Sequence, residues 1–142
     1  IANGDWSSDV CSSDLKKNAL YKSFGYALEG VAVGIRQERN MKIHCAAAVL
    51  VVLAGIFLRL SATEWCLCLI LFGLILALEL VNTAVEAVVD LVTEEYKPLA
   101  KRAKDTAAGA VFIAAVMAAI VGCILFLPKI WTLFSAVMTP GA

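Results

Sequence analysis

Apolar residues occur in this chain as three long blocks, separated by short polar segments. Residues 43–58 are apolar apart from His44, and residues 65–78 and 106–127 carry no charged side chain. About 20 apolar residues in a helix cross the hydrocarbon core of a bilayer. We therefore predict three membrane-spanning helices, over residues 41–60, 64–92 and 102–127.

Residues 16–39 show a different pattern, in which apolar side chains recur every three or four positions. The face that they form contains Leu20, Phe24, Ala27, Leu28, Val31 and Ile35. Lys22, Glu29 and Arg36 cluster on the opposite face of such a helix. An amphipathic helix with a basic start suits the membrane–water interface, so we predict a surface helix over 16–39.

The two ends of the chain lack these patterns. Residues 1–15 are polar and contain a near-duplication, SSDV and SSDL, without the basic and apolar regions of a signal peptide. We expect this segment to be a non-native or disordered leader. We also expect a loop over 93–99, a third span that ends at Pro128, and a frayed tail over 135–142. Residues 16–134 then form one membrane domain.

Glu79, Asn82, Glu86 and Asp90 form a polar stripe on the second predicted span. At about 100° per residue, these side chains fall within an arc of roughly 80° on a helix that is otherwise Leu, Val and Ala. A carboxylate in such surroundings is costly unless it has a cation, a partner or a reaction to serve. The stripe is therefore the candidate functional site, as a proton or ion relay or as a catalytic centre.

Composition narrows the choice of partner. Because the chain is 61% hydrophobic, we expect it to lie in a bilayer. Because its formal net charge is zero, we expect it to bind no nucleic acid. The cysteines show no metal-ligand spacing, and we expect Cys45, Cys66, Cys68 and Cys123 to be small buried residues.

Basic residues indicate the orientation of the spans. Most of them precede the first span or lie between the second and third, and only Arg59 and Lys129 lie on the other side. The positive-inside rule then places the N-terminus, the second loop and the polar stripe on the cytoplasmic side of the membrane.

Three charged segments converge on this cytoplasmic boundary. They are Glu38 before the first span, the polar stripe, and Lys104 with Asp105 at the start of the third span. Carboxylates that hold Mg²⁺ and a lysine that contacts phosphates are the groups needed for phosphoryl transfer from ATP. Glu79 lies deeper than Glu86, so a lipid hydroxyl would meet Glu79 and a metal–nucleotide would meet Glu86.

Two motifs carry a resemblance to a known family. ELVNTAVEAVVD at residues 79–90, followed by AKDTAAGAV at 103–111, resembles the prokaryotic diacylglycerol kinase family. The resemblance extends from about Leu20 to Trp131. It implies an all-α integral membrane protein with an amphipathic surface helix and three transmembrane helices. It also implies a homotrimer with active sites shared between subunits, which uses ATP and Mg²⁺ to phosphorylate a lipid alcohol.

The resemblance also implies roles for individual residues. Glu79 matches the catalytic base, Glu38 and Glu86 the magnesium ligands, and Asn82 and Asp90 the supporting polar residues. Glu38 and Glu86 also match nucleotide contacts, as do further residues in the surface helix, in the loop and at the start of the third span. These further nucleotide contacts are Tyr26, Glu95, Tyr96, Lys97, Lys104 and Asp105.

The identity of the lipid depends on two further segments. ERNMKIH at 38–44 and YKPLAK at 96–101 resemble the undecaprenol kinases of the family more than its diacylglycerol kinases. Undecaprenol is therefore the expected acceptor, and diacylglycerol is the alternative. The more remote alternative is a small transporter or assembly subunit that uses the carboxylates as a relay.

One protomer has too little intramembrane surface to enclose the carboxylates of the stripe. We therefore expect a neighbouring subunit to cover the Glu79 face, because carboxylates that face lipid are costly. We also expect Glu38 and Glu79 of one site to come from different chains.

Overall fold

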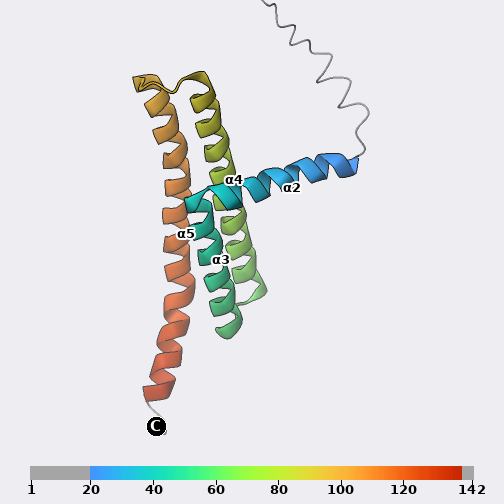
Figure 1. Cartoon of the computed structure of the whole chain (residues 1–142). Helices are drawn as coiled ribbons and strands as arrows, with labels where there is room; N and C mark the ends of the chain where they lie inside the picture. The colour runs from blue at the N-terminus through green and yellow to red at the C-terminus, as the bar shows by residue number, and fades with distance from the viewer. Residues whose placement is uncertain (1–19, 139–142) are drawn as a thin grey trace, which may run out of the picture. The chain divides into compact units, whose positions relative to one another are not determined.

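The part of the chain that the structure describes consists of α-helices and the short segments that connect them. The computed structural model describes residues 20–138 and the side chains of residues 22–138. Its helices are α2 (Leu20–Gln37), α3 (Arg39–Phe57), α4 (Ala62–Val92) and α5 (Pro98–Met138) (Figure 1). The all-α prediction is confirmed. The predicted leader over 1–15 lies outside the described residues, as do residues 16–19 and 139–142.

The chain divides into two compact units at the junction of Val33 and Gly34. In the first unit, the described side chains of 22–33 are exposed, except that of Ala32, which is half-buried. The second unit contains the last turn of α2 and the helices α3, α4 and α5. All residues of the candidate site except Tyr26 belong to this second unit.

The boundary between α2 and α3 is a break at Glu38. This residue has extended backbone angles (φ −84°, ψ 125°), and it is the N-cap of α3. The helix predicted over 16–39 therefore ends at Gln37, and Glu38 lies at the start of the next helix. The extended backbone allows α3 to take a new direction at a candidate site residue.

The prolines near the third span show where its prediction needs correction. The loop predicted over 93–99 ends before Pro98, which starts α5, because a proline at the first helical position has no N–H that needs a partner. Pro128 lies inside α5, which continues to Met138, so the prediction that Pro128 ends the span is wrong. The hydroxyl of Thr132 donates a hydrogen bond to the Pro128 carbonyl at 2.9 Å. The carbonyl that loses its helical N–H donor at Pro128 is that of Ile124, and membrane helices tolerate an internal proline where such a carbonyl finds another partner.

The start of α4 is fixed by a capping box. Ser61 accepts a hydrogen bond from the Glu64 backbone at 3.4 Å, and its own N–H donates to the Glu64 carboxylate at 2.7 Å. The other Glu64 oxygen pairs with Lys129 of α5 at 3.2 Å. This end of α4 is thereby tied to α5.

Helix α4 packs against both of its neighbours, over a longer contact with α5 than with α3. Glycines permit close approach on the α3 side. A Cβ atom at Gly34 would lie 2.7 Å from Cδ2 of Leu80, and one at Gly55 would lie 2.9 Å from the Trp65 ring. Both glycines are buried. Larger side chains at these positions would push the end of α2 or the end of α3 away from α4.

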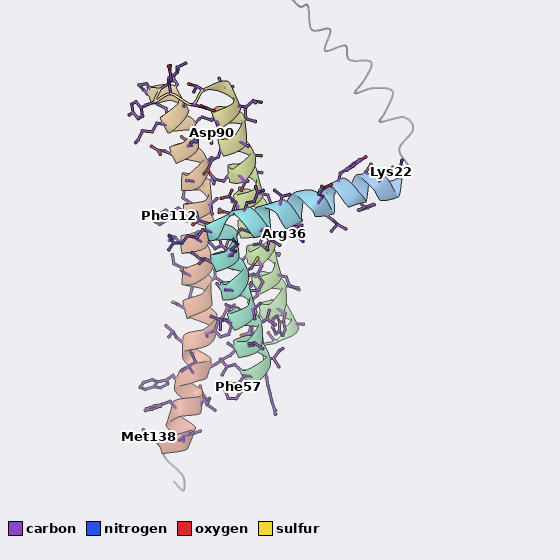
Figure 2. All side chains as sticks on the ribbon, viewed as in Figure 1. Lys22, Arg36, Phe57, Asp90, Phe112 and Met138 are labelled. Carbon is purple, nitrogen blue, oxygen red and sulfur yellow. The ribbon has the colours of Figure 1, made fainter. Side chains whose placement is uncertain are left out.

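The outward faces of these helices are apolar. Phe112 is 68% exposed and points away from the neighbouring helices (Figure 2), and Leu50, Ile70 and Ile124 are exposed to a similar degree. The helices α3, α4 and α5 are long and apolar enough to cross a membrane. A water-soluble protein rarely exposes so much apolar surface, whereas lipid chains cover it in a bilayer.

Some cysteines lie on the buried faces of these helices and others on the outward faces. Cys68 is buried and Cys45 is half-buried, but Cys66 and Cys123 are exposed on the outer faces. The prediction that all of them are buried is therefore wrong for Cys66 and Cys123. In a membrane helix, a small apolar residue can face lipid as readily as the protein interior.

Candidate active site

The buried face of α4 changes from apolar to polar along its length. Its buried residues are Cys68 and Ile75, then Glu79 and Asn82. Glu79 is 1% exposed and Asn82 is 5% exposed. Because these four residues share one face of the helix, the two polar side chains extend the stripe by which α4 packs against its neighbours.

Glu79 is surrounded by polar groups of α3 and of its own helix. The side chains of Asn40, His44, Glu38 and Glu86 lie near the Glu79 carboxylate, close enough to act on it electrostatically. Its Oε2 atom is buried without a hydrogen-bond partner. A buried acceptor without a partner is costly in a folded protein, so this atom is poised to accept a proton or hydrogen bond from a ligand.

One chain therefore brings Glu38 close to Glu79. This proximity arises because the break at Glu38 returns the start of α3 to the buried face of α4. It favours a pair within one chain over the expectation that the two residues of one site come from different chains, which mixed trimers test. Glu38 is half-buried. It contributes a second carboxylate beside the deepest residue of the site.

Asn82 connects the buried part of the stripe to its outer part. Its amide Nδ2 donates a hydrogen bond to Glu86 Oε1 at 2.9 Å, while its Oδ1 atom is buried without a partner. Glu86 is half-buried. Asn82 thus holds one oxygen of Glu86 in place and presents a further oxygen of its own to the same site.

The outer end of the stripe is paired with α5. Asp90 is exposed and forms an ion pair with Lys104 near the loop that joins α4 to α5 (Figure 2). Lys101 pairs with Asp105, four residues further along α5, at 2.9 Å.

The predicted nucleotide contacts of the loop lie on an open surface. Glu95, Tyr96 and Lys97 are exposed, and Tyr96 borders a hollow of about 410 Å³ together with Lys101 and Asp105. Arg102 also lines this hollow, although its position was not singled out in the sequence. Tyr26 is 62% exposed and belongs to the first unit.

Comparison with known proteins identifies the family. The model of the prokaryotic diacylglycerol kinase family matches residues 25–126. The chain belongs to this family. The matched region contains every candidate site residue from Tyr26 to Asp105, including the buried stripe of α4.

Several proteins of known name are similar to this family member. Undecaprenol kinase of Bacillus subtilis (strain 168) is 47% identical over 113 residues, which cover 80% of this chain and 92% of that protein. Diacylglycerol kinase of Synechocystis sp. is 44% identical over 126 residues, with coverages of 84% and 72%. Diacylglycerol kinase of Escherichia coli (strain K12) is 34% identical over 106 residues, with coverages of 75% and 87%. The chain is thus a membrane-bound lipid kinase, for which ATP is the co-substrate.

The donor set of this kinase fits a magnesium ion. Glu38, Glu86 and the Oδ1 atom of Asn82 are hard oxygen donors at the same end of the bundle. Among the described residues, no three His, Cys, Asp or Glu side chains form a ready metal site. Mg²⁺ is commonly held by one or two carboxylates, with water and substrate phosphates as its remaining ligands. Two carboxylates and one amide oxygen are sufficient for that kind of binding.

Asn40 and His44 are site residues that the sequence reasoning missed. They lie one turn apart on α3. The sequence feature that indicates them is the polarity of both side chains at the start of an apolar block. Which face of α3 meets Glu79 depends on the break at Glu38, which helical periodicity does not reveal.

Proposed function

We propose that this kinase transfers the γ-phosphoryl group of ATP to the hydroxyl group of undecaprenol. The observation that carries the proposal is the Oε2 atom of Glu79, which is buried without a partner at the deep end of a polar stripe. An acceptor at that depth suits a substrate that approaches from the lipid. A nucleotide that approaches from water would reach the outer part of the stripe first.

Glu79 acts as the general base. Its carboxylate accepts the proton of the lipid hydroxyl as that oxygen forms a bond to the γ-phosphorus of ATP. The bond between the γ-phosphorus and the bridging oxygen to the β-phosphate breaks, and ADP leaves with that oxygen. Burial around Glu79 excludes water, which would otherwise compete with the lipid hydroxyl for the phosphoryl group.

Glu38 and Glu86 would hold Mg²⁺, with Asn82 and Asp90 in support of them. A bound Mg²⁺ would neutralise the charge of the transferring phosphates. Lys104 contributes a positive charge to the nucleotide, and Asp105 lies beside it on α5. The remaining nucleotide contacts are assigned to Tyr26, Glu95, Tyr96 and Lys97.

The protein is placed in the bacterial cytoplasmic membrane with its N-terminus and active site on the cytoplasmic side. The distribution of basic residues supports this orientation. Helix α2 lies at the surface of the bilayer, and its exposed apolar residues, such as Phe24 and Leu28, support that location. The kinase assembles as a homotrimer. In this trimer, each chain covers outward-facing polar and apolar side chains of its neighbours.

Diacylglycerol is the second candidate acceptor. Two of the similar proteins described above are named diacylglycerol kinases. Both acceptors are lipid alcohols, so the stripe of α4 performs the same chemistry on either. The difference lies in the hydrocarbon next to the hydroxyl group.

A comparison of the two acceptors tests the proposal. The purified kinase is reconstituted into vesicles with either undecaprenol or diacylglycerol at equal mole fraction, with ATP and Mg²⁺. We expect kcat/KM to be higher for undecaprenol. A higher value for diacylglycerol would contradict the proposed acceptor, and phosphorylation of neither lipid would contradict the proposed reaction.

A further inference from the structure

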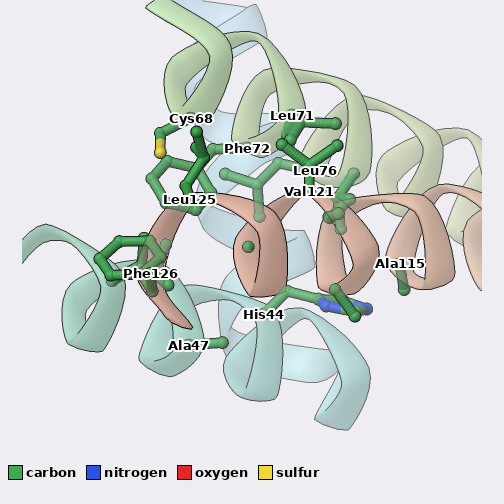
Figure 3. A pocket seen from close by; sticks show the side chains of 16 residues that line it. His44, Ala47, Cys68, Leu71, Phe72, Leu76, Ala115, Val121, Leu125 and Phe126 are labelled. Atoms are coloured by element: carbon green, nitrogen blue, oxygen red, sulfur yellow. The ribbon is translucent and has the colours of Figure 1, made fainter. Parts of the chain in front are cut away.

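An apolar cavity, which is partly open to the outside of the bundle, lies between α3, α4 and α5. Its volume is about 270 Å³ (Figure 3). The space exists because small side chains line two of its walls, on α3 and on α5. These small residues are Ala47, Ala48, Ala115, Ala118, Ala119 and Gly122. Phe72 and Leu76 of α4 form part of the third wall.

The size of the cavity suits a short piece of hydrocarbon. An apolar cavity of about 150 Å³ is large enough to bind benzene and stays dry when empty. The cavity in this kinase therefore accommodates about two groups of that size. Two isoprene units next to a hydroxyl group have roughly the same bulk.

His44 gives the cavity a polar end. It is the only lining residue whose side chain contains nitrogen or oxygen. Figure 3 shows its imidazole pointing from α3 toward Ala115 of α5. An imidazole can donate or accept a hydrogen bond, so a chain in this cavity would place a polar end group at His44.

The polar end of the cavity adjoins the catalytic carboxylate. On α4, Ile75 lines the cavity and Glu79 follows one turn later, a rise of about 6 Å. On α3, His44 lines the cavity, and Asn40, one turn earlier, lies near Glu79. Both helices therefore lead from the cavity to Glu79 within a single turn.

We infer that this cavity binds the hydroxyl-proximal hydrocarbon of the acceptor lipid, about two isoprene units long, while His44 hydrogen-bonds to the acceptor hydroxyl. The inference rests on the proposed function and adds to it the residues that align the lipid. The cavity holds the chain along the axis of the bundle, and His44 positions the hydroxyl oxygen beside Glu79. His44 is thus a positioning residue for the acceptor.

A cavity-filling variant tests the location of the chain. Ala118→Leu places three additional carbon atoms in the cavity, and Ala110→Leu makes the same change on an exposed part of α5 away from it. The kinase is assayed with prenol, geraniol and farnesol, which have one, two and three isoprene units. We expect Ala118→Leu to raise KM for geraniol and farnesol about tenfold and to leave KM for prenol within about twofold. Ala110→Leu should leave all three KM values unchanged.

Ala48→Leu fills the cavity from the α3 side and replaces Ala118→Leu if that variant does not fold. An equal change of KM for all three alcohols, or the same change in Ala110→Leu, would overturn the inference. Unaltered KM values in the cavity-filling variants would also overturn it, because the chain would then bind elsewhere.

Variants of His44 test the position of the hydroxyl. We expect His44→Leu to lower kcat/KM about tenfold for every alcohol regardless of length, and His44→Gln to restore most of the loss because it retains a hydrogen-bonding group. A loss that grows with chain length, or equal losses in both variants, would contradict this role.

Failure of the inference can be separated from failure of the proposed function. The wild-type protein tests the function, because it must phosphorylate a prenyl alcohol. If it phosphorylates only diacylglycerol, the proposed acceptor is wrong, and the same variants are compared with diacylglycerols of increasing acyl length. A length-dependent rise of KM in Ala118→Leu then supports the cavity as the chain site, and a uniform one overturns it.

Discussion

Asn82 donates a hydrogen bond to Glu86 across 2.9 Å while its own amide oxygen remains buried and unpaired. This contact orients a proposed magnesium ligand by a neighbouring side chain. Removal of such a supporting partner typically lowers metal affinity about 10- to 100-fold. We expect Asn82→Ala to raise the Mg²⁺ concentration for half-maximal activity by at least about tenfold.

Thr83→Val is the matched control for Asn82→Ala. The Thr83 hydroxyl bonds only to the backbone carbonyl of Glu79, at 3.0 Å, so its loss should leave the Mg²⁺ midpoint unchanged. Both variants are titrated with Mg²⁺ at saturating ATP and lipid. Equal midpoints for Asn82→Ala and the wild type would show that Asn82 does not orient a metal ligand.

Glu38→Gln and Glu86→Gln each remove one anionic oxygen from the proposed magnesium site. We expect both to raise the Mg²⁺ midpoint without a matching rise in the lipid KM, because a neutral amide is a poorer ligand for a hard cation. Glu29→Gln, on an exposed part of α2, serves as the control. A raised lipid KM with an unchanged Mg²⁺ midpoint would assign Glu38 and Glu86 to the acceptor instead.

Lys104 forms an ion pair with Asp90 and is proposed to contact the nucleotide. We expect Lys104→Met to raise KM for ATP about 10- to 100-fold, the range for a lost hydrogen bond to a charged group. Thermal stability in detergent should change little, because an exposed ion pair contributes little to stability. Lys22→Met is the control. An unaltered KM for ATP would remove Lys104 from the nucleotide site.

The pattern of apolar blocks was sufficient to predict the number and type of the long helices, because a bilayer demands long uninterrupted apolar segments. It did not predict their ends. Pro98 begins α5 and Pro128 lies within it, since the effect of a proline depends on whether its neighbours satisfy the backbone. The break at Glu38 was also missed, although it determines where α3 meets α4.

The polar stripe of α4 was predictable because its members share one helical face. How deeply each member of the stripe is buried was not predictable, because the burial depends on which side chains α3 and α5 bring to that face. Asn40 and His44 reach Glu79 only through the packing of α3. The partner of Asp90 is Lys104 because the short connection between α4 and α5 brings these two residues together.

Glu38 lies near Glu79 within one chain, whereas Lys104 of the same chain forms an ion pair with Asp90. Asp90 is eleven residues beyond Glu79, a rise of about 16 Å along α4. A lysine held there does not reach a γ-phosphate at Glu79 of its own chain, so we expect a neighbouring subunit to supply it. Mixed trimers of Glu79→Gln and Lys104→Met chains should regain activity, and mixtures of Glu79→Gln and Glu38→Gln chains should not.

The mixed trimers are isolated by two different affinity tags and assayed against each parent. Recovery in the Glu38 mixture would mean that the two carboxylates act across a subunit boundary. Absence of recovery in the Lys104 mixture would mean that each chain completes its own nucleotide site.

The central claim is that Glu79 accepts the proton of a lipid hydroxyl while the γ-phosphoryl group moves to that hydroxyl. It is tested most directly with ATP labelled in the γ-phosphate, supplied with Mg²⁺ and undecaprenol to reconstituted wild-type and Glu79→Gln kinase. We predict label in the lipid fraction for the wild type, and a rate lower by about 10²- to 10⁴-fold in Glu79→Gln at an unchanged oligomeric state. Label confined to free phosphate, or a Glu79→Gln rate above about a third of the wild-type rate, would contradict the account, since a general base contributes far more than that.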